Sequence, residues 1–326
     1  MSAPRVGFLG VGWIGRHRME AILRTGAVEA AAIADPSQEC ADAALKLAPD
    51  AKLVGGLDDM LALGLDGIVI ATPSALHADQ SIRALQAGAA VFCQKPLGRT
   101  AAEVETVIGA ARAADRLLAV DFSYRFTEAM QRIAPLVRSG VLGRVHAVDL
   151  IFHNAYGPDK DWFYDPARSG GGCVMDLGVH LVDLALWALD WPDVEQVEAH
   201  LLSGGEPAGS GRCEDYAVAT LRLAGGTVVR LACSWRLQAG REAVIAAEFY
   251  GSEGGAAMRN VAGSFYDFTA ERFAGTSAER LASPPDAWGG RAAAEWARRL
   301  AGGERFDPDA RRIADVARVL DRIYAR

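Results

Sequence analysis

The sequence is poor in cysteine, and its cysteines form no pattern that signals a disulfide framework or a zinc site. There are five, an odd number, scattered along 326 residues without a C-x-x-C pair: Cys40, Cys93, Cys173, Cys213 and Cys233. Disulfide-stapled secreted folds use dense, even sets of cysteines, and structural zinc sites use closely spaced pairs. We therefore expect free thiols, most of them buried, in a reducing cytoplasm, and no bound metal ion.

Long apolar runs and clusters of basic residues are also missing. No run approaches the roughly 20 apolar residues of a membrane span, and the first residues lack the apolar segment and cleavage site of a signal peptide. The chain is 51% hydrophobic and 23% charged, with a net charge of -7. These values predict a globular protein that binds neither a membrane nor nucleic acid, and the length favours two domains.

Residues 1–122 alternate short apolar segments with segments of helical periodicity. The apolar segments lie at residues 5–10, 28–37, 66–74, 90–96 and 117–123, and the helical segments between them at 11–26, 40–49, 76–89 and 100–115. Strands that are apolar throughout must be covered on both faces, and alternation with helices indicates parallel strands. The pattern predicts an α/β domain over residues 1–122, a doubly wound parallel sheet of the Rossmann type.

Residues 123–326 follow a different pattern, in which strands succeed one another with short turns. Alternation of apolar and polar residues marks strands near 143–154, 194–203, 214–237, 243–259 and 265–270, with a hairpin turn at 223–228. Helices are predicted near 124–140, 169–190, 292–303 and 310–326. This predicts a C-terminal α+β domain with a mostly antiparallel open sheet, for substrate binding and oligomerisation.

A glycine motif follows the first strand and opens the first helix. Gly10, Gly12 and Gly15 have the spacing of a dinucleotide fingerprint, in which glycines allow a tight turn, a pyrophosphate and close helix packing. Asp35 comes 20 residues later, at the end of the second strand. A carboxylate there accepts hydrogen bonds from the ribose diol and repels a 2′-phosphate. The motif therefore predicts NAD, with NADP less favoured. The alternative is that the glycines only make a turn and Asp35 only caps a helix.

A lone lysine, Lys95, lies where another buried strand ends. Ligands of doubly wound sheets bind beyond the carboxyl ends of the strands, so Lys95 is expected at the ligand edge, together with Thr72, Pro73 and Gln94. Loops often carry lysines for solubility alone. A cation at this edge can instead stabilise a developing alkoxide.

Three glycines at 170–172 precede a predicted helix with polar residues at helical spacing. Asp176 and His180 fall on one face of that helix near its N-terminus, followed by Asp183. One interpretation is a helix cap and a core histidine. A metal site is another, but no third ligand is spaced to join the pair. A third is acid–base catalysis, because histidine gains and loses a proton near neutral pH.

Together these motifs resemble the Gfo/Idh/MocA family of oxidoreductases, over nearly the whole chain. The landmarks are residues 10–15, Ala71-Thr72-Pro73 with His77, Lys95-Pro96, Tyr124-Arg125-Phe126, and Gly170-Gly171-Gly172 with Asp176, His180 and Asp183. The resemblance implies a Rossmann domain and a second domain whose sheet forms a homodimer or homotetramer. It also implies NAD(P)-dependent hydride transfer to or from a secondary alcohol or ketone of a sugar, cyclitol or related polyol.

The resemblance also implies residue roles. Lys95 would lie beside the nicotinamide, and Asp176 and His180 would enter from the second domain, so these three are the expected catalytic residues. The expected cofactor-binding residues are Gly10, Gly12, Trp13, Ile14, Gly15, Asp35, Thr72, Pro73, His77, Gln94, Lys95 and Arg125. Weaker candidates for the substrate are Tyr124, His153, Tyr156, Trp162 and Arg168.

One position departs from the family pattern. The family usually has glutamate before Lys-Pro, and this chain has Gln94. Our hypothesis is that Lys95 loses its proton more easily here, or that Gln94 contacts substrate or cofactor differently. Two other functions stay open: an enzyme of the same fold that holds NAD tightly and oxidises its substrate only transiently, for elimination or hydrolysis, and a catalytically silent NAD-binding protein.

Overall fold

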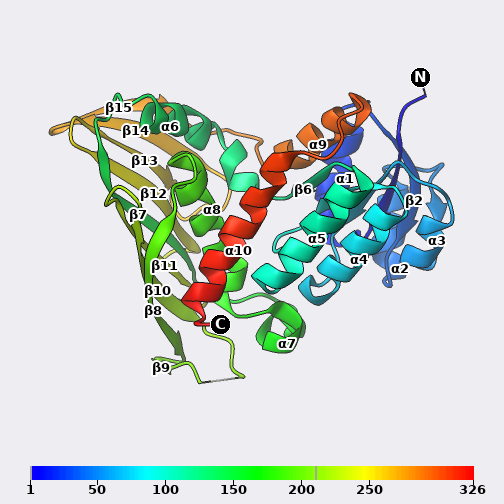
Figure 1. The fold of residues 1–326 in the computed structure, drawn as a ribbon, viewed down its shortest axis with the longest axis horizontal. Helices are drawn as coiled ribbons and strands as arrows, with labels where there is room; N and C mark the ends of the chain where they lie inside the picture. The colour runs from blue at the N-terminus through cyan, green and yellow to red at the C-terminus, as the bar shows by residue number, and fades with distance from the viewer. Residues whose placement is uncertain (1, 210) are drawn as a thin grey trace. The chain divides into compact units, whose positions relative to one another are not determined.

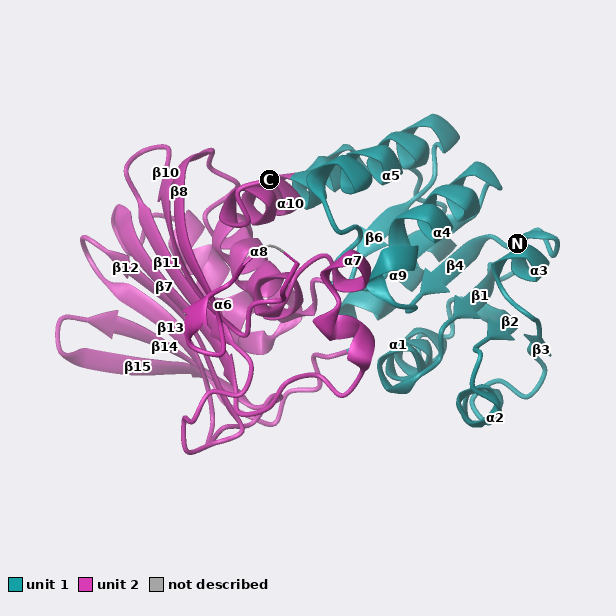
Figure 2. Cartoon of the chain, turned by 90° about the horizontal axis from the view of Figure 1, so that it is seen from below, with its two compact units in different colours: residues 1–121, 290–314 teal, residues 122–289, 315–326 magenta. Residues whose placement is uncertain are grey.

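The computed structural model describes residues 2–209 and 211–326, which form two compact units (Figure 2). Unit 1 contains the chain up to residue 121 and residues 290–314, and unit 2 contains residues 122–289 and 315–326. The first boundary lies within one residue of the expected one. The expectation that all of residues 123–326 form the second domain is wrong for residues 290–314, which group with unit 1.

Unit 1 is built on a six-stranded parallel sheet with the strand order β3-β2-β1-β4-β5-β6. Its strands are β1 (Arg5–Leu9), β2 (Glu29–Ala34), β3 (Lys52–Leu53), β4 (Gly67–Ile70), β5 (Ala90–Cys93) and β6 (Leu118–Val120). The helices between them are α1 (Trp13–Leu23), α2 (Gln38–Leu45), α3 (Leu57–Leu61), α4 (Ser74–Gln86) and α5 (Ala101–Ala114). Strand order reverses between β1 and β4, which places the ligand edge beyond these two strands.

Helix α9 (Arg291–Ala301) explains why residues 290–314 belong to unit 1. Its Trp296 is fully buried, with its ring centroid 5.9 Å from that of Phe92 in β5. Gly67 in β4 makes room for it, since a Cβ there would lie 2.9 Å from a ring carbon of Trp296. The amphipathic pattern identifies this helix correctly but does not say which sheet it covers.

Unit 2 is built on a nine-stranded sheet with the order β15-β14-β13-β12-β7-β11-β10-β8-β9. Among the described strands every neighbouring pair is antiparallel except β7 and β11, which are parallel. The strands are β7 (Val145–Asn154), β8 (Val194–Ser203), β9 (Glu206–Pro207), β10 (Tyr216–Leu223), β11 (Val228–Ser234), β12 (Ala243–Gly251), β13 (Gly255–Asn260), β14 (Phe268–Ala274) and β15 (Ser277–Ala282).

Helices cover one face of this sheet and leave the other open (Figure 1). The helices on this face are α6 (Glu128–Arg138) and α8 (Val179–Ala188). Unit 2 also contains the short α7 (Pro166–Ser169) and the last part of α10 (Arg311–Ile323). Short 3-10 helices span Ser123–Phe126, Asp161–Tyr164 and, in unit 1, Pro308–Ala310. A π-helical turn, Val174–Gly178, leads directly into α8. It was not expected from the sequence, and such turns recur at functional sites.

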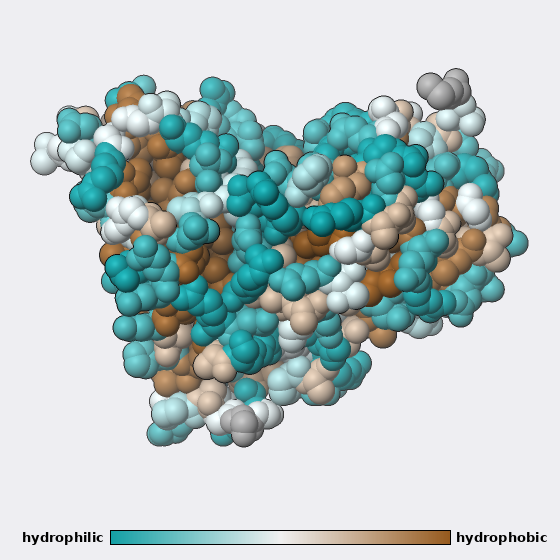
Figure 3. Space-filling view, viewed as in Figure 1, coloured by the Kyte–Doolittle hydropathy of each residue, from teal (hydrophilic) through white to brown (hydrophobic). Residues whose placement is uncertain are grey.

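One stretch, residues 166–188, is long and apolar enough to cross a membrane by length and composition alone. Of its most apolar window, 89% is buried within the protein, as expected for a core helix. The face shown in Figure 3 mixes hydrophilic side chains with smaller apolar patches.

Candidate active site

The glycine turn between β1 and α1 has the shape that a dinucleotide needs. Gly10 has a φ of +84°, and a Cβ there would lie 2.6 Å from the carbonyl oxygen of Ala71. A Cβ at Gly15 would lie 2.1 Å from the Gly10 carbonyl oxygen, so both positions exclude a side chain. At Gly12 a Cβ would meet no heavy atom within 4 Å. The turn is therefore closed on its protein side and open at Gly12, which fits a pyrophosphate at the start of α1.

Asp35, directly after β2, is fixed beside this turn. Its Oδ2 accepts a hydrogen bond from the Val11 backbone N–H at 2.7 Å, and its Oδ1 accepts one from Ser37 N–H at 2.9 Å. The side chain is half-buried, and each carboxylate oxygen can accept a second hydrogen bond. The residues present therefore fit the ribose diol of NAD.

His77 joins the turns that follow β4 and β5. It is buried, and its two ring nitrogens lie 2.6 Å from the Thr72 carbonyl oxygen and 2.7 Å from that of Pro96. Burial lowers the pKa of His77, while the two carbonyl oxygens oppose that shift. Pro73 directly precedes α4, and Thr72 Oγ1 donates to Gln80 Oε1 at 2.6 Å. The structure thus gives His77 a bracing role, and its contact with a cofactor stays a prediction.

A buried ion pair, joined by the side-chain amide of Gln94, lies at the turn that carries Lys95. Gln94 Nε2 donates to Asp121 Oδ2 at 2.7 Å, and Arg18 Nε from α1 donates to the same oxygen at 2.6 Å. All three side chains are less than 10% exposed. Sequence reasoning places Asp121 at the carboxyl edge of the sheet, immediately after β6, but gives it no role, and it misses Arg18.

The remaining predicted cofactor residues differ in their surroundings. Trp13 is 62% exposed and stacks on His17, with the ring centroids 6.1 Å apart, and Ile14 follows it in α1. Arg125, in unit 2, forms a two-point ion pair with the buried Asp183, one of whose bonds is Nε to Oδ2 at 2.8 Å. Burial raises the pKa of Asp183, and Arg125 opposes that shift. Cofactor contacts by these residues stay predictions.

The segment that carries Asp176 and His180 is anchored by a buried carboxylate, Glu214. Its oxygens accept hydrogen bonds from the backbone N–H groups of Gly172 at 3.0 Å and Val174 at 2.9 Å, and from the Tyr324 hydroxyl at 2.8 Å. Burial raises the pKa of Glu214, and these hydrogen bonds oppose that shift. Sequence reasoning missed Glu214, because it precedes β10, far along the chain from the helix that it anchors.

Asp176 and His180 each have a defined aromatic neighbour. The indole Nε1–H of Trp235, just after β11, donates to Asp176 Oδ2 at 3.0 Å. Asp176 is half-buried, while His180 is 7% exposed. The His180 ring meets the Tyr124 ring edge-on, with centroids 4.8 Å apart. The helix therefore presents a hydrogen-bonded carboxylate and an imidazole held by ring packing.

The substrate candidates lie in unit 2 with unequal exposure. His153 Nδ1 lies 2.8 Å from Ser234 Oγ, its ring stacks on Tyr216, and burial lowers its pKa. Tyr156 is 52% exposed, Arg168 is exposed, and the Trp162 ring stacks on Phe163 at 3.8 Å. Tyr124 is buried in a ring cluster with His180, which favours packing over direct substrate contact.

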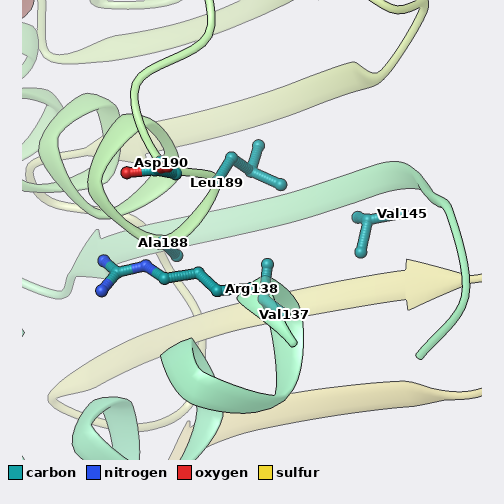
Figure 4. Close-up of a pocket in the computed structure, with 6 residues that line it drawn as sticks. All are labelled: Val137, Arg138, Val145, Ala188, Leu189 and Asp190. Carbon is teal, nitrogen blue, oxygen red and sulfur yellow. The ribbon is translucent and has the colours of Figure 1, made fainter. Parts of the chain in front are cut away.

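A separate pocket of about 250 Å³ lies at the other end of α8 (Figure 4). It is lined by the end of α6, the start of β7 and the end of α8: Val137, Arg138, Val145, Ala188, Leu189 and Asp190. Ala188 is eight residues beyond His180, which places the pocket about 12 Å along the helix from that imidazole. Among the described residues no group of three or more His, Cys, Asp or Glu could hold a metal ion.

Comparison with known proteins agrees with this geometry. Residues 4–122 match the model of an oxidoreductase family with an NAD-binding Rossmann fold, and residues 130–257 match a GFO/IDH/MocA C-terminal domain. Among curated relatives, D-glucoside 3-dehydrogenase of Escherichia coli K12 is 28% identical over 61% of this chain and 60% of its own length. Inositol 2-dehydrogenase of Acidiphilium cryptum is 32% identical over 57% of this chain and 54% of its own length.

The chain thus spans less than two thirds of the length of these relatives. Levoglucosan dehydrogenase, solved with NADH and levoglucosan, superposes with a TM-score of 0.85 at 21% identity, over 99% of this chain and 97% of that one. An oxidoreductase domain protein from Kribbella flavida superposes with a TM-score of 0.83 at 22% identity, over 100% of this chain and 97% of that one. At this identity the two structures show the fold alone. With both of its domain models matched in order, the chain belongs to the GFO/IDH/MocA oxidoreductase family.

Proposed function

We propose that the protein is an NAD-dependent dehydrogenase or reductase acting on a secondary alcohol or ketone of a sugar, cyclitol or related polyol. One observation carries the proposal: a braced lysine turn, at residues 94–96, follows β5 at the carboxyl edge of an NAD-binding sheet. Relatives named as glucoside, inositol and levoglucosan dehydrogenases support the substrate class.

The chemistry divides between the cofactor and the chain. Bound NAD would accept a hydride from the carbinol carbon, or NADH would return one. Lys95 would donate a hydrogen bond to the carbinol oxygen and stabilise its developing negative charge. His180 would take the proton in oxidation and give it back in reduction. Asp176, already held by Trp235, would orient the imidazole or bind a substrate hydroxyl.

The cofactor preference rests on Asp35. Its carboxylate lies beside the turn that fits the pyrophosphate and would repel the 2′-phosphate of NADP. Gly10, Gly12, Gly15 and Thr72 belong to the same edge of the sheet. We therefore propose NAD as the cofactor and NADP as the poorer one.

The first experiment is a binding titration with NADH and with NADPH, after a spectrum of the denatured supernatant has shown whether cofactor is already bound. Tighter binding of NADH followed by turnover of sugars or cyclitols would support the proposal. Preference for NADPH would overturn the role of Asp35. Trapped NAD without turnover of added NAD would favour transient oxidation, and binding without any turnover would favour a silent NAD-binding protein.

A lysine variant tests the catalytic part. Lys95→Met should abolish polyol turnover while NADH binding persists, because the ammonium acts on the reacting oxygen. Lys46→Met, at an exposed position after α2, is the matched control and should behave as the parent. Full activity of the Lys95 variant would contradict the assignment.

We further propose a homodimer or homotetramer through the open face of the unit 2 sheet. Charges on this face are already paired within the chain, Arg230 with Asp149 at 2.9 Å and Arg259 with Glu248 at 2.6 Å, and pairing lowers the cost of covering them. Sedimentation analysis of the parent tests this assembly. A cytoplasmic location is supported by cysteines that are all free thiols.

A further inference from the structure

Lys95 is flanked on both sides by anchored residues. On one side, the Gln94 backbone N–H donates to the Ile70 carbonyl oxygen at 2.9 Å, and its side chain donates to Asp121 Oδ2. On the other side, the Pro96 carbonyl oxygen lies 2.7 Å from His77 Nδ1. The backbone that presents Lys95 is thus held by one carboxylate and one imidazole.

The carboxylate is held in turn by the cofactor helix. Arg18 in α1 donates to the same Asp121 oxygen as Gln94, and its Nη1 lies 2.9 Å from His17 Nδ1. Asp121 itself follows β6, where its backbone N–H donates to the Cys93 carbonyl oxygen at 3.0 Å. One guanidinium, one carboxylate and one amide therefore connect α1, β5 and β6 beneath the turn at residues 94–96.

This group is costly to bury, which argues that it does more than stabilise the fold. Asp121 is 1% exposed, and within residues 2–209 and 211–326 its Oδ1 has no hydrogen-bond partner. A buried polar atom without a partner lowers stability, and apolar residues of similar size often replace buried ion pairs without loss. The presence of this buried ion pair is explained if it fixes the position of the turn that carries Lys95.

We propose that Asp121 is the positioning residue for Lys95, and that residues 94 and 121 form a reciprocal amide–carboxylate pair. The carboxylate that the family usually carries before the lysine is here supplied by the neighbouring strand, and Gln94 supplies the amide that meets it. The carboxylate missing at position 94 is then offset by one on the neighbouring strand, Asp121. This inference rests on the proposed function, because that function gives Lys95 its catalytic role.

The rival interpretation is an ion pair that serves the fold alone. In that case, loss of Asp121 lowers stability and leaves the turnover of folded enzyme unchanged, and position 94 has no special relation to position 121. A reciprocal exchange separates the two interpretations. Asp121→Asn combined with Gln94→Glu keeps one guanidinium, one carboxylate and one amide, but moves the carboxylate to the position that the family uses.

The experiment compares Asp121→Asn, Gln94→Glu and the double variant with the parent enzyme. For each we would measure kcat with NAD and the best polyol, the NADH dissociation constant and the melting temperature. Asp115→Asn is the matched control, because Asp115 also pairs with an arginine of unit 1, Arg305, at 3.0 Å but is exposed. It should leave kcat unchanged.

We expect each single variant to lower kcat by about tenfold or more, the size typical of losing a group that orients a reacting residue. The NADH affinity of Asp121→Asn should stay within about twofold, and the double variant should recover most of kcat, because the pair is restored. Two results would overturn the proposal: a stability loss in Asp121→Asn without a fall in kcat, or a double variant no better than the singles. If Asp121→Asn does not fold, Gln94→Met, which keeps the ion pair and removes only the amide, should show the same fall in kcat.

A second readout does not depend on activity. The chain has only four lysines, Lys46, Lys52, Lys95 and Lys160, so carbon-labelled lysine gives a simple NMR spectrum. The Lys95 side-chain signal should move in Asp121→Asn and return in the double variant, while the other three stay in place. An unmoved Lys95 signal would overturn the positioning role even if no polyol is turned over, whereas absent turnover in the parent would count against the proposed function alone.

Discussion

At the scale of single residues, Asp35 performs two tasks with one carboxylate. It holds the glycine turn through Val11 N–H and the following turn through Ser37 N–H, so its position is fixed before any nucleotide arrives. A fixed negative charge discriminates against a phosphate more strongly than a mobile one, because it cannot turn away. We therefore expect cofactor choice to depend on this one side chain.

Asp35→Asn should narrow the preference for NADH over NADPH. The amide keeps an oxygen that can accept from Val11 N–H but removes the charge that repels the 2′-phosphate, so we expect the ratio of dissociation constants to fall by about tenfold. Fluorescence titration with both cofactors measures it. Asp42→Asn, at an exposed position on α2, is the control. An unchanged ratio would show that selection lies elsewhere.

Trp235 also acts at the residue scale, through its indole N–H to Asp176. Trp235→Phe keeps a ring but removes that donor, so we expect kcat to fall by several-fold, on the order of the 1 kcal/mol typical of one hydrogen bond. NADH binding should not change. Trp296→Phe is the control, since the Trp296 indole N–H has no hydrogen-bond partner among the described residues. It should cost stability only, and equal kcat losses in both variants would contradict the assignment.

At the scale of elements, the π-helical turn that leads into α8 depends on a close approach between two segments of the chain. A Cβ at Gly172 would lie 2.0 Å from the backbone oxygen and 2.7 Å from the backbone nitrogen of Glu214. Backbone atoms cannot move aside as a flexible side chain can. The π-helical turn, and with it Asp176, is therefore held in place by an approach that only glycine permits.

Gly172→Ala should lower both stability and turnover. We expect a loss of more than about 2 kcal/mol in the free energy of unfolding, as is typical where a backbone clash has no escape. Gly109→Ala in α5 is the matched control, because a Cβ there meets nothing within 4 Å, and it should stabilise the protein by about 0.5–1 kcal/mol. Urea unfolding of the two variants measures these free energies, and a polyol assay measures turnover. A Gly172 variant as stable as the parent would show that the two segments separate easily.

The limits of sequence-based prediction are clearest at this scale. Apolar periodicity located the helix around Asp176 and His180 but not its π-helical first turn, because one inserted residue hardly changes a periodicity. It found α9 but not the sheet that α9 covers, because one apolar face suits either sheet. The glycine turn was predictable, since its constraints lie within a few consecutive residues. Glu214 and Asp121 were not assigned, because their partners are distant in the sequence.

At the scale of the whole molecule, histidines away from solvent couple stability to pH. Burial lowers the pKa of the buried His77 and of the half-buried His153. A histidine whose pKa is lower in the folded than in the unfolded chain binds its proton first in the unfolded chain. The contribution of these histidines to folding stability is therefore fully present above the unfolded pKa of 6.5, and it is lost as pH falls below that value.

The His77 contribution can be isolated by comparing the parent with His77→Gln between pH 5 and pH 8. The raised pKa values of Glu214 and Asp183 make the protein more stable as pH falls, which is the opposite effect. Both carboxyl groups are present in the parent and in the variant, so their effect cancels when the two stabilities are subtracted. We expect the stability gap between the two proteins to shrink as pH falls below 6.5, by at most about 1.4 kcal/mol per pH unit. Urea unfolding at several pH values measures it, and a gap that widens toward acid would reverse the sign of the argument.

The last residues of the chain have a consequence for reading genomes. Tyr324 donates to Glu214 and accepts from the Met175 backbone N–H at 3.2 Å, so a hydroxyl near the C-terminus supports the segment that carries Asp176. A frameshift just before the codon for Tyr324 would spare every nucleotide-binding motif, and the gene would still be classed with this family. Its product would nevertheless lack this support. The codon for Tyr324 is therefore one to check before a related gene is counted as encoding an active enzyme.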